Sequence, residues 1–320
     1  MNRQSIERAA ERLAPWITRT PTISSAWLSS AAGASVWLKL ETEQITGSFK
    51  ARGAMHALLA LKERAPEIDL VVTASAGNHG QALAWAGQQL GIRVRAHAPR
   101  TAADTKKASM RHYGADLIEA PDYDAAELAA REDATRSGVP YVSPYNHDDV
   151  IAGQGTIALE MLEDAPDIDV FVIAVGGGGL ISGCAIVAKD RAQPLGVIGA
   201  EAEASPVFTT ALAARAITPV LVRPTLAEAL AGNLEPGSRT FPLVQHLVDG
   251  MALVAEGSIE IAMRGLHQRH RLVTEGAGAV ATAALLQGLG LDGHTVGVVV
   301  CGRNVDMTQF SRIVGAPASS

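Results

Sequence analysis

The chain has few cysteines and no excess of basic residues. Its 320 residues include only Cys184 and Cys301, which are too few for a disulfide framework. Lys and Arg number 27 against 33 Asp and Glu, a net charge of −6, and this balance gives no broad cationic surface. We therefore expect a cytoplasmic protein with no nucleic-acid partner and no membrane partner.

Uninterrupted apolar segments are also missing. The N-terminal stretch MNRQSIERAAERLA is charged and amphipathic, so it lacks the apolar core of a secretory signal. One uncharged run reaches spanning length, at residues 170–188, but four consecutive glycines interrupt it. Such a run favours a strand, a tight loop and a buried helix over a transmembrane helix. No repeat, low-complexity tract or Pro-rich linker divides the chain.

Strand-like and helix-like segments alternate along most of the sequence. The short apolar runs, mostly β-branched, are residues 36–40, 70–74, 92–98, 115–120, 170–175, 195–201, 251–255 and 295–300. The segments with helical character are residues 49–64, 78–90, 102–113, 125–136 and 150–162. This alternation predicts parallel sheets covered by helices on both faces. The strands are too many for one small sheet, so we expect two α/β lobes, one of them inserted in the other.

The first motif with chemical content is TGSFKARG, at residues 46–53. A turn leads into a predicted helix that Thr46 or Ser48 could cap, with Lys50 in the first helical turn. The positive end of the helix and nearby Arg52 would lower the pKa of this lysine. An unprotonated lysine is the nucleophile that forms a Schiff base. The alternative is an ordinary solvated lysine at the start of a helix.

The second motif, TASAGNHG at residues 73–80, joins a predicted buried strand to a helix. Ligands of open α/β sheets bind at such carboxyl ends of strands, and free N–H groups at a helix start suit a carboxylate. Asn78 offers an amide to a phenolic or carbonyl oxygen. The motif is not a serine-hydrolase turn around Ser75, because Thr73 occupies the first glycine position. The alternative is an ordinary tight turn, with His79 in a structural role.

The third motif, GGGGL at residues 176–180, places bare backbone amides before a helix, which makes an anion cradle. No lysine follows as in a P-loop, and Ile181 breaks the dinucleotide spacing, so the loop suits a generic phosphate. A close-packing glycine run is the alternative. The last strand ends at Cys301, in the expected pocket, unless it is only a buried thiol.

Signals for metals and for charged partners are weak. His267 and His270 lie three residues apart on a predicted helix, which is more typical of a solvated face than of a ligand pair. We therefore predict no metal site. One helix also carries a basic face that we expect to point to solvent: Lys106, Lys107, Arg111 and His112.

In this order, the motifs resemble the fold-type II pyridoxal-phosphate enzymes, and within them the serine/threonine dehydratase group, which includes serine racemase-like and hydroxyectoine-utilisation dehydratase-like members. The resemblance runs from about Ile17 to Asp306 and includes KLETEQITGSFKARGA, TASAGNHGQALA, GGGGLISG, LAGNLEPGSRTF, TEGAGA and CGRNVD. It implies a tryptophan synthase β-like α/β fold with two open, twisted parallel-sheet lobes. The larger lobe would comprise residues 1–68 and 147–320, and residues 69–146 would form the smaller, inserted lobe.

The resemblance also implies bound pyridoxal 5′-phosphate and a role for each matching residue. Lys50 matches the lysine that holds the cofactor and moves the Cα proton, and Phe49 matches the residue beside the cofactor ring. Asn78 matches the amide that binds the 3-hydroxyl, and Cys301 matches the neutral partner of the pyridine nitrogen. The phosphate loop is matched by Gly176, Gly177, Gly178, Gly179 and Leu180. The loop for the substrate carboxylate is matched by Ser75, Ala76, Gly77 and His79.

The implied reaction converts a β-hydroxy amino acid such as threonine or serine to a 2-oxo acid and ammonia. Ala76 stands where serine racemases of the family carry a serine acid/base, which favours the dehydratase. A family cation site would begin at Glu201, but Val207 replaces its later carboxylate, so we expect no metal there. Arg303 replaces a usual glycine. A cation at the pocket rim could select an acidic or unusual substrate, and the alternative is an Arg303 that points to solvent.

Several alternatives stay open. On the same scaffold they are a serine racemase-like isomerase, a β-replacement enzyme, and a dehydratase of hydroxyaspartate, phenylserine or a hydroxyectoine-derived amino acid. Others are a non-catalytic cofactor-binding protein and a sugar- or nucleotide-binding α/β protein. We expect a homodimer or homotetramer that takes a small amino acid. Because the resemblance ends soon after CGRNVD, we expect no C-terminal regulatory domain.

Overall fold

Two sheets organise the chain in the computed structural model, which describes residues 1–75 and 77–316. The larger sheet has the strand order β1-β2-β9-β6-β7-β8, and the smaller has the order β3-β4-β5. The strands are β1 (Thr22–Ser24), β2 (Ser35–Leu40), β3 (Leu70–Ala74), β4 (Arg93–Pro99), β5 (Asp116–Ala120), β6 (Val170–Ala174), β7 (Gly196–Ala202), β8 (Gly250–Val254) and β9 (Thr295–Val300).

Helices connect nearly all of these strands. They are α1 (Arg3–Leu13), α2 (Ala26–Ala32), α3 (Lys50–Arg64), α4 (Asn78–Leu90), α5 (Asp104–His112), α6 (Tyr123–Ser137), α7 (Asp148–Asp164), α8 (Gly179–Lys189), α9 (Val207–Ala214), α10 (Thr240–Leu247), α11 (Glu256–His270), α12 (Gly276–Leu286) and α13 (Met307–Gly315), with short 3₁₀ turns η1 (Glu41–Glu43) and η2 (Glu228–Leu230). Within the described residues, none of them is long and apolar enough to cross a membrane.

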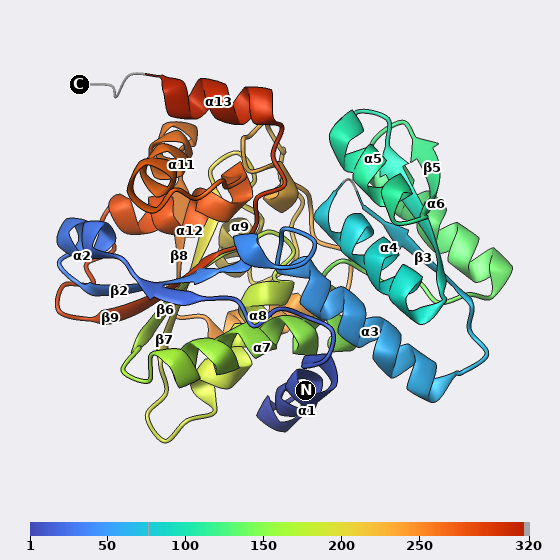
Figure 1. Ribbon diagram of the computed structural model, residues 1–320, viewed down its shortest axis with the longest axis horizontal. Coiled ribbons are helices and arrows are strands. Elements are labelled where there is room, and N and C mark those ends of the chain that lie inside the picture. Colours follow the sequence, from blue (N-terminus) through green and yellow to red (C-terminus); the bar gives the residue numbers. More distant parts are fainter. Residues whose placement is uncertain (76, 317–320) are drawn as a thin grey trace.

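The fold is a two-lobed α/β structure, as predicted. In Figure 1, α11 and α12 cover one face of the larger sheet and α7 and α8 cover the other. The three strands of the smaller sheet follow one another in the chain between β2 and β6, so the smaller lobe is inserted in the larger. Lobe boundaries at residues 68/69 and 146/147 stay a proposal.

Every predicted strand and helix lies within about two residues of an observed one. The predicted strands pair in parallel as expected, and β1, which the sequence analysis did not predict, pairs antiparallel with β2 at one edge. A strand of three residues is too short to give a periodic signal. Helix α12, GAGAVATAALL, also has no amphipathic pattern because almost its entire surface is buried.

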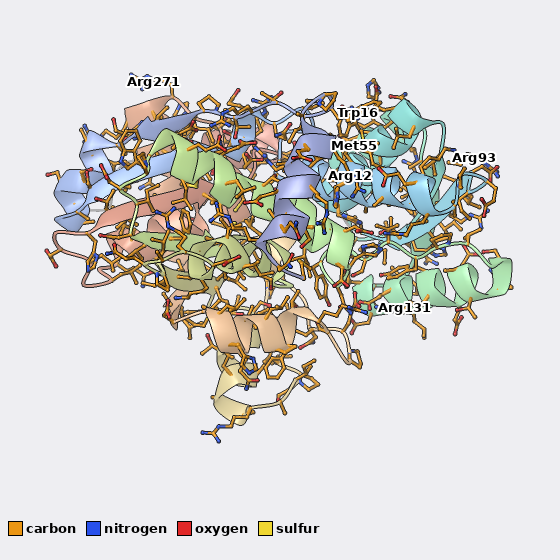
Figure 2. All side chains as sticks on the ribbon, turned by 90° about the horizontal axis from the view of Figure 1, so that it is seen from below. Arg12, Trp16, Met55, Arg93, Arg131 and Arg271 are labelled. Atoms are coloured by element: carbon orange, nitrogen blue, oxygen red, sulfur yellow. The ribbon has the colours of Figure 1, made fainter. Side chains whose placement is uncertain are left out.

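Two apolar cores support the lobes. The larger is built around β6, β9, α8 and α12. The second joins α3 and α4 to β3 and includes Met55, with Trp16 packed against it (Figure 2). Helix α3 contributes to this second core and also packs along α7 of the larger lobe, so it lies at the junction of the lobes.

A buried ion-pair network fixes the start of α3. The Arg52 guanidinium donates two hydrogen bonds to the Glu41 carboxylate, at 2.9 and 2.8 Å, and two to the Glu160 carboxylate, at 2.6 and 2.8 Å. Burial alone would lower the pKa of Arg52, but the carboxylates of Glu41 and Glu160 raise the pKa of Arg52 above its ordinary value. Lys39 completes the network through Glu160, at 2.7 Å. The network therefore joins α3 to the end of β2 and to α7.

Replacing Arg52 by Met should destabilise the protein by about 3–5 kcal/mol, because Glu41 would remain as a buried charge without its main partner. Arg64→Met is the matched control on the same helix, since Arg64 is largely exposed and pairs with Asp149 at the surface. We expect the control to change the free energy of unfolding by less than about 1 kcal/mol. Urea denaturation measures both, and equal losses would contradict the role given to the network.

Candidate active site

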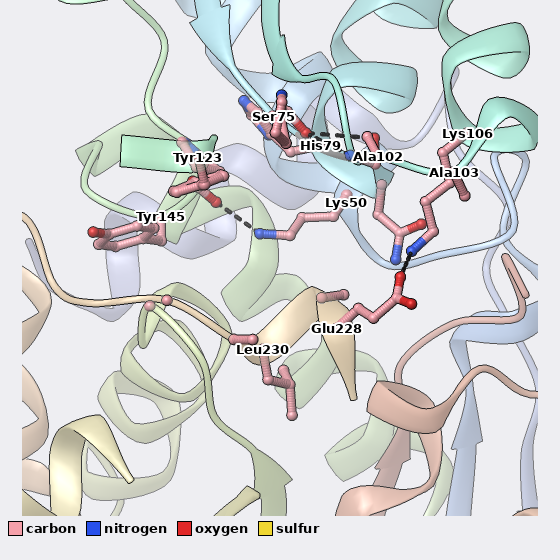
Figure 3. A pocket seen from close by; sticks show the side chains of 18 of the residues that line it. Lys50, Ser75, His79, Ala102, Ala103, Lys106, Tyr123, Tyr145, Glu228 and Leu230 are labelled. Carbon is pink, nitrogen blue, oxygen red and sulfur yellow. Dashed lines mark hydrogen bonds and ion pairs between the residues drawn. The ribbon is translucent and has the colours of Figure 1, made fainter. Parts of the chain in front are cut away.

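The carboxyl ends of β3 and β6 face a cavity of about 350 Å³ between the lobes. Lys50, Asn78, Tyr145 and Gly177 line it. Figure 3 shows the Lys50 side chain extending across the cavity, with Ser75 and His79 on one side and Leu230 and Glu228 on the other. This is the region in which open α/β sheets bind ligands.

Lys50 is the first residue of α3. Its Nζ donates a hydrogen bond to the Pro144 carbonyl at 2.8 Å and lies 5.1 Å from the centre of the Phe49 ring. Burial lowers the pKa of Lys50 to about 8, and the acidic groups of Cys301 and Glu275 act in the opposite direction. The amine therefore loses its proton more readily than an ordinary lysine, and a minor part of it is unprotonated near neutral pH.

The predicted outcome for Lys50 is confirmed in direction, but the predicted cause was wrong. The sequence interpretation invoked the charge of Arg52, whose guanidinium instead points into the Glu41–Glu160 network. The expected cap is also absent, because Phe49 holds the N-cap position without a side-chain hydrogen bond. The hydroxyls of Thr46 and Ser48 are buried and have no partner among the residues that the structure describes.

Asn78, the first residue of α4, is held by hydrogen bonds on both sides of its carboxamide. Its Nδ2 donates to the Glu275 carboxylate at 2.6 Å, and its Oδ1 accepts from Asn304 Nδ2 at 2.8 Å. Burial raises the pKa of Glu275 to about 7, against the opposing effects of Lys106 and Asn78. Glu275 belongs to the TEGAGA motif, but sequence analysis assigned it no role, because its partner is 197 positions away.

The glycine loop between β6 and α8 approaches other backbone and aromatic groups closely. A Cβ on Gly176 would lie 2.8 Å from the Leu230 backbone, and one on Gly177 would overlap the Tyr145 ring. Gly178 has a φ of +82°, which disfavours other residues. No hydrogen bond joins the N–H groups of Gly176, Gly177, Gly178, Gly179 and Leu180 to other parts of the described chain. These N–H groups are therefore free to bind a ligand as far as the described chain is concerned, and their role as an anion cradle stays a prediction.

Tyr145 and its neighbours form the wall opposite the glycine loop. The Tyr145 hydroxyl accepts a hydrogen bond from the Glu235 N–H at 2.8 Å. The Glu235 carboxylate accepts hydrogen bonds from Ser143 and from Asn146, each at 2.7 Å, and pairs with Arg131 of α6. Sequence analysis assigned no role to Tyr145 or to Glu235, which belongs to the LAGNLEPGSRTF motif, because no local pattern links residues 90 positions apart. Together they fix the segment whose Pro144 carbonyl holds Lys50.

The predicted carboxylate loop reaches the cavity with Ser75, Gly77 and His79, while Ala76 lies outside the described residues. The Ser75 hydroxyl accepts from the N–H groups of Gly77 and Gly80, at 3.1 and 2.9 Å, so it stabilises the loop itself. Burial, with the nearby charge of Lys50, lowers the pKa of His79 to about 3. His79 is therefore a neutral imidazole at neutral pH.

Cys301 directly follows β9 and is buried, and it is not among the described residues that line the cavity of Lys50. Its carbonyl accepts a hydrogen bond from the Phe49 N–H at 3.1 Å, and its thiol lies 3.6 Å from the Val299 carbonyl. Burial raises the pKa of the thiol, so it is neutral. The backbone bond ties the end of β9 to the residue that precedes Lys50.

The expectation that the basic face of α5 points to solvent was wrong for Lys106 and for Lys107, which is buried and pairs with Glu119 at 3.3 Å. Lys106 does not face solvent, because it lines the cavity and pairs with Glu228 at 2.8 Å (Figure 3). Of the two positions left open for Arg303, the rim of the Lys50 cavity is not the one observed: Arg303 pairs with Glu43 at 3.2 Å and faces a neighbouring cavity. Charge patterns along one helix or loop do not reveal such pairings between distant segments.

Glu201, where a cation site was in question, is fully engaged by the start of α9. Its carboxylate accepts from the N–H of Phe208 at 2.7 Å and from the N–H and hydroxyl of Thr209 at 2.9 and 2.7 Å. Among residues 1–75 and 77–316, no group of three metal-ligating side chains is found. The absence of a bound metal stays a prediction.

Comparison with known proteins gives consistent matches over nearly the whole chain. The family described as pyridoxal-phosphate dependent enzyme matches residues 13–302. An L-threonine ammonia-lyase of Thermotoga maritima is 40% identical over 97% of this chain and 77% of its own length. A pyridoxal 5′-phosphate-dependent aspartate racemase superposes with a TM-score of 0.90 at 33% identity, covering 97% and 98% of the two chains. The processed form of threonine deaminase isoform 2 from Solanum lycopersicum gives 0.88 at 31% identity, covering 98% and 88%.

Burial of the Lys50 amine is expected to lower the free energy of unfolding of the cofactor-free protein by an amount that depends on pH. A lysine whose pKa falls from 10.5 to about 8 on folding destabilises the folded state below pH 8, and this cost is lost as the pH rises toward 10.5. Cofactor-free Lys50→Met should therefore be about 1–3 kcal/mol more stable than the parent at pH 7, with a smaller difference at pH 10. Chemical denaturation at the two pH values measures this. A less stable variant at pH 7 would contradict the burial argument.

Proposed function

The chain belongs to the family of pyridoxal-phosphate-dependent enzymes, and from this premise we propose that it eliminates water from a β-hydroxy amino acid, threonine or serine by default. The products are a 2-oxo acid and ammonia. The chain is a pyridoxal-phosphate-dependent lyase, and its curated relatives are a threonine ammonia-lyase and threonine dehydratases. The observation that carries the proposal is one buried, partly unprotonated lysine beside a loop of unpaired backbone amides.

The residues around the cavity fit the cofactor. Its aldehyde requires an amine, and Lys50 places one in a cavity of about 350 Å³. Its phosphate requires donors, and the N–H groups from Gly176 to Leu180 have no other partner in the described chain. Phe49, Asn78 and Cys301 are the proposed contacts for the ring, the 3-hydroxyl and the pyridine nitrogen. When bound, pyridoxal phosphate draws electron density away from the substrate α-carbon.

Lys50 is the proposed catalytic base. Its burial keeps part of the amine unprotonated. The amine donates a hydrogen bond to the Pro144 carbonyl, which fixes the position of the nitrogen. The amine would accept the α-proton of the substrate, and the β-hydroxyl would leave as water. Hydrolysis then releases ammonia, so the net change is one amino acid to one 2-oxo acid and one ammonia.

The groups that would hold the substrate lie at the start of α4. The N-terminus of this helix suits the α-carboxylate, and Ser75, Ala76, Gly77 and His79 are the proposed contacts. Because burial keeps His79 neutral, it would contact the carboxylate as a neutral imidazole and not as a cation. Across the mouth, the Lys106–Glu228 ion pair presents both signs of charge toward the side chain of the substrate.

A racemase is the second candidate, because the aspartate racemase has a TM-score of 0.90 with this chain. Racemisation needs a second acid/base group on the opposite face of the α-carbon. Position 76 carries alanine, which has no proton to exchange. This difference favours elimination. We further propose that the protein works in the cytoplasm as a homodimer or homotetramer.

Purified protein should release a 2-oxo acid and ammonia from at least one β-hydroxy amino acid, and Lys50→Ala should lose at least a thousandfold in rate together with the visible band of bound cofactor. Lys62→Ala, further along α3, is the control and should retain both. A panel of threonine, serine, hydroxyaspartate and phenylserine is assayed by coupled keto-acid reduction.

Two results would overturn the proposal. One is full turnover by Lys50→Ala, which would remove the proposed base. The other is release of the opposite enantiomer without any 2-oxo acid, which would make the racemase the correct function.

A further inference from the structure

The carboxamide of Asn78 is fixed by two side chains that the family resemblance gave no role. Glu275 lies directly before α12 and accepts from Asn78 Nδ2 at 2.6 Å. Asn304 follows β9 and donates to Asn78 Oδ1 at 2.8 Å. All three side chains belong to different segments of the chain, so their meeting is a product of the tertiary fold.

The chemistry of the partners determines which end of the amide is which. Asn304 Nδ2 also donates to the Thr46 carbonyl at 2.9 Å, and a backbone carbonyl can only accept. The atom of Asn304 that faces Thr46 is therefore the nitrogen. The second hydrogen of this nitrogen needs an acceptor, so the atom of Asn78 that it meets is the oxygen. An ionised Glu275 also only accepts, so it selects the Asn78 nitrogen. A rotated Asn78 would place oxygen against carboxylate and nitrogen against nitrogen.

The two partners also lie on different sides of Asn78. Glu275 is buried, and the charged and titratable groups that act on it are Lys50 of α3, Lys106 of α5 and Glu228 of η2, all of which line the Lys50 cavity. The charge of Glu275 in turn helps to raise the pKa of the Cys301 thiol, directly after β9. Asn304 lines the neighbouring cavity with Arg303 instead. Lys106 lines both cavities, whereas Lys50 lines only the first and Asn304 only the second, so the hydrogen bond to Glu275 is on the Lys50 side of Asn78 and the hydrogen bond from Asn304 is on the other.

We propose that Glu275 and Asn304 are positioning residues that lock the Asn78 carboxamide with its nitrogen toward the cofactor cavity, so that the protein offers a hydrogen-bond donor to the phenolic oxygen of the cofactor. One hydrogen of Nδ2 is used by Glu275, and the second has no partner within the described residues. A donor stabilises the deprotonated phenolic oxygen, whereas an acceptor would stabilise the protonated form. The inference rests on the proposed cofactor site. It adds the two residues that decide which end of the Asn78 carboxamide meets the cofactor.

The test compares variants that keep or remove the acceptor at position 275. Glu275→Gln can still accept from Asn78, and its cofactor affinity and phenolic titration should stay within about threefold of the parent. Glu275→Leu cannot accept, and should weaken cofactor binding roughly tenfold to a hundredfold, the range for a hydrogen bond to a charged group. The pH midpoint at which the visible band of bound cofactor is lost to protonation should rise by about one unit.

Asn304→Asp tests the other side of the amide. It replaces a donor by an acceptor, which favours rotation of Asn78, so the midpoint should shift in the same direction as in Glu275→Leu. Glu43→Gln is the control, because Glu43 is an exposed carboxylate that pairs with Arg303 near the same loop, and it should leave the band unchanged. Thermal denaturation of each holoenzyme identifies any variant that does not fold. If one of Glu275→Leu and Asn304→Asp does not fold, the other alone tests the inference.

An unchanged titration in the folded informative variants would overturn the inference, as would equal shifts in Glu275→Gln and Glu275→Leu, which would assign the effect to charge instead of orientation. The proposed function fails separately, when the parent protein itself forms no visible band with pyridoxal phosphate. A normal band in the parent with no effect at positions 275 and 304 removes the positioning role alone.

Discussion

The buried pairing of Arg52 with Glu41 and Glu160 is the constraint on which the site depends. It joins the first turn of α3 to the end of β2 and to α7, and so fixes where Lys50 begins its path into the cavity. Buried ion pairs contribute little net stability, but breaking one is costly. Here the ion pairs matter because they fix the position of the first turn of α3, from which Lys50 must point between the lobes. The hydrogen bond from Phe49 to the Cys301 carbonyl holds the same turn from the other side.

Desolvation is the main influence on the chemistry of the cavity. It lowers the pKa of Lys50 to about 8, lowers that of His79 to about 3 and raises that of Glu275 to about 7. All three shifts favour the neutral forms of these groups. The anion cradle of the glycine loop is also built from neutral amides. Such a site suits a ligand that brings its own charges.

The sequence predicted the parts of the site that depend on local patterns. Strand ends, tight turns and glycine runs are local features, and they placed Lys50, Asn78, the glycine loop and Cys301 in one region. The contacts between segments could not be predicted in this way. Lys106 was assigned to solvent and Arg303 was left between the pocket rim and solvent, because their partners Glu228 and Glu43 lie far away in the chain. Tyr145, Glu235 and Glu275 were assigned no role for the same reason.

The central claim is that the amine of Lys50 forms the covalent link to the cofactor. The direct measurement is borohydride reduction of the protein with pyridoxal phosphate, followed by digestion and mass spectrometry. The account predicts one reduced pyridoxyl adduct, on the peptide that contains Lys50 and on none of the other five lysines. A peptide of unmodified mass at Lys50, or a stoichiometric adduct on another lysine, would contradict it.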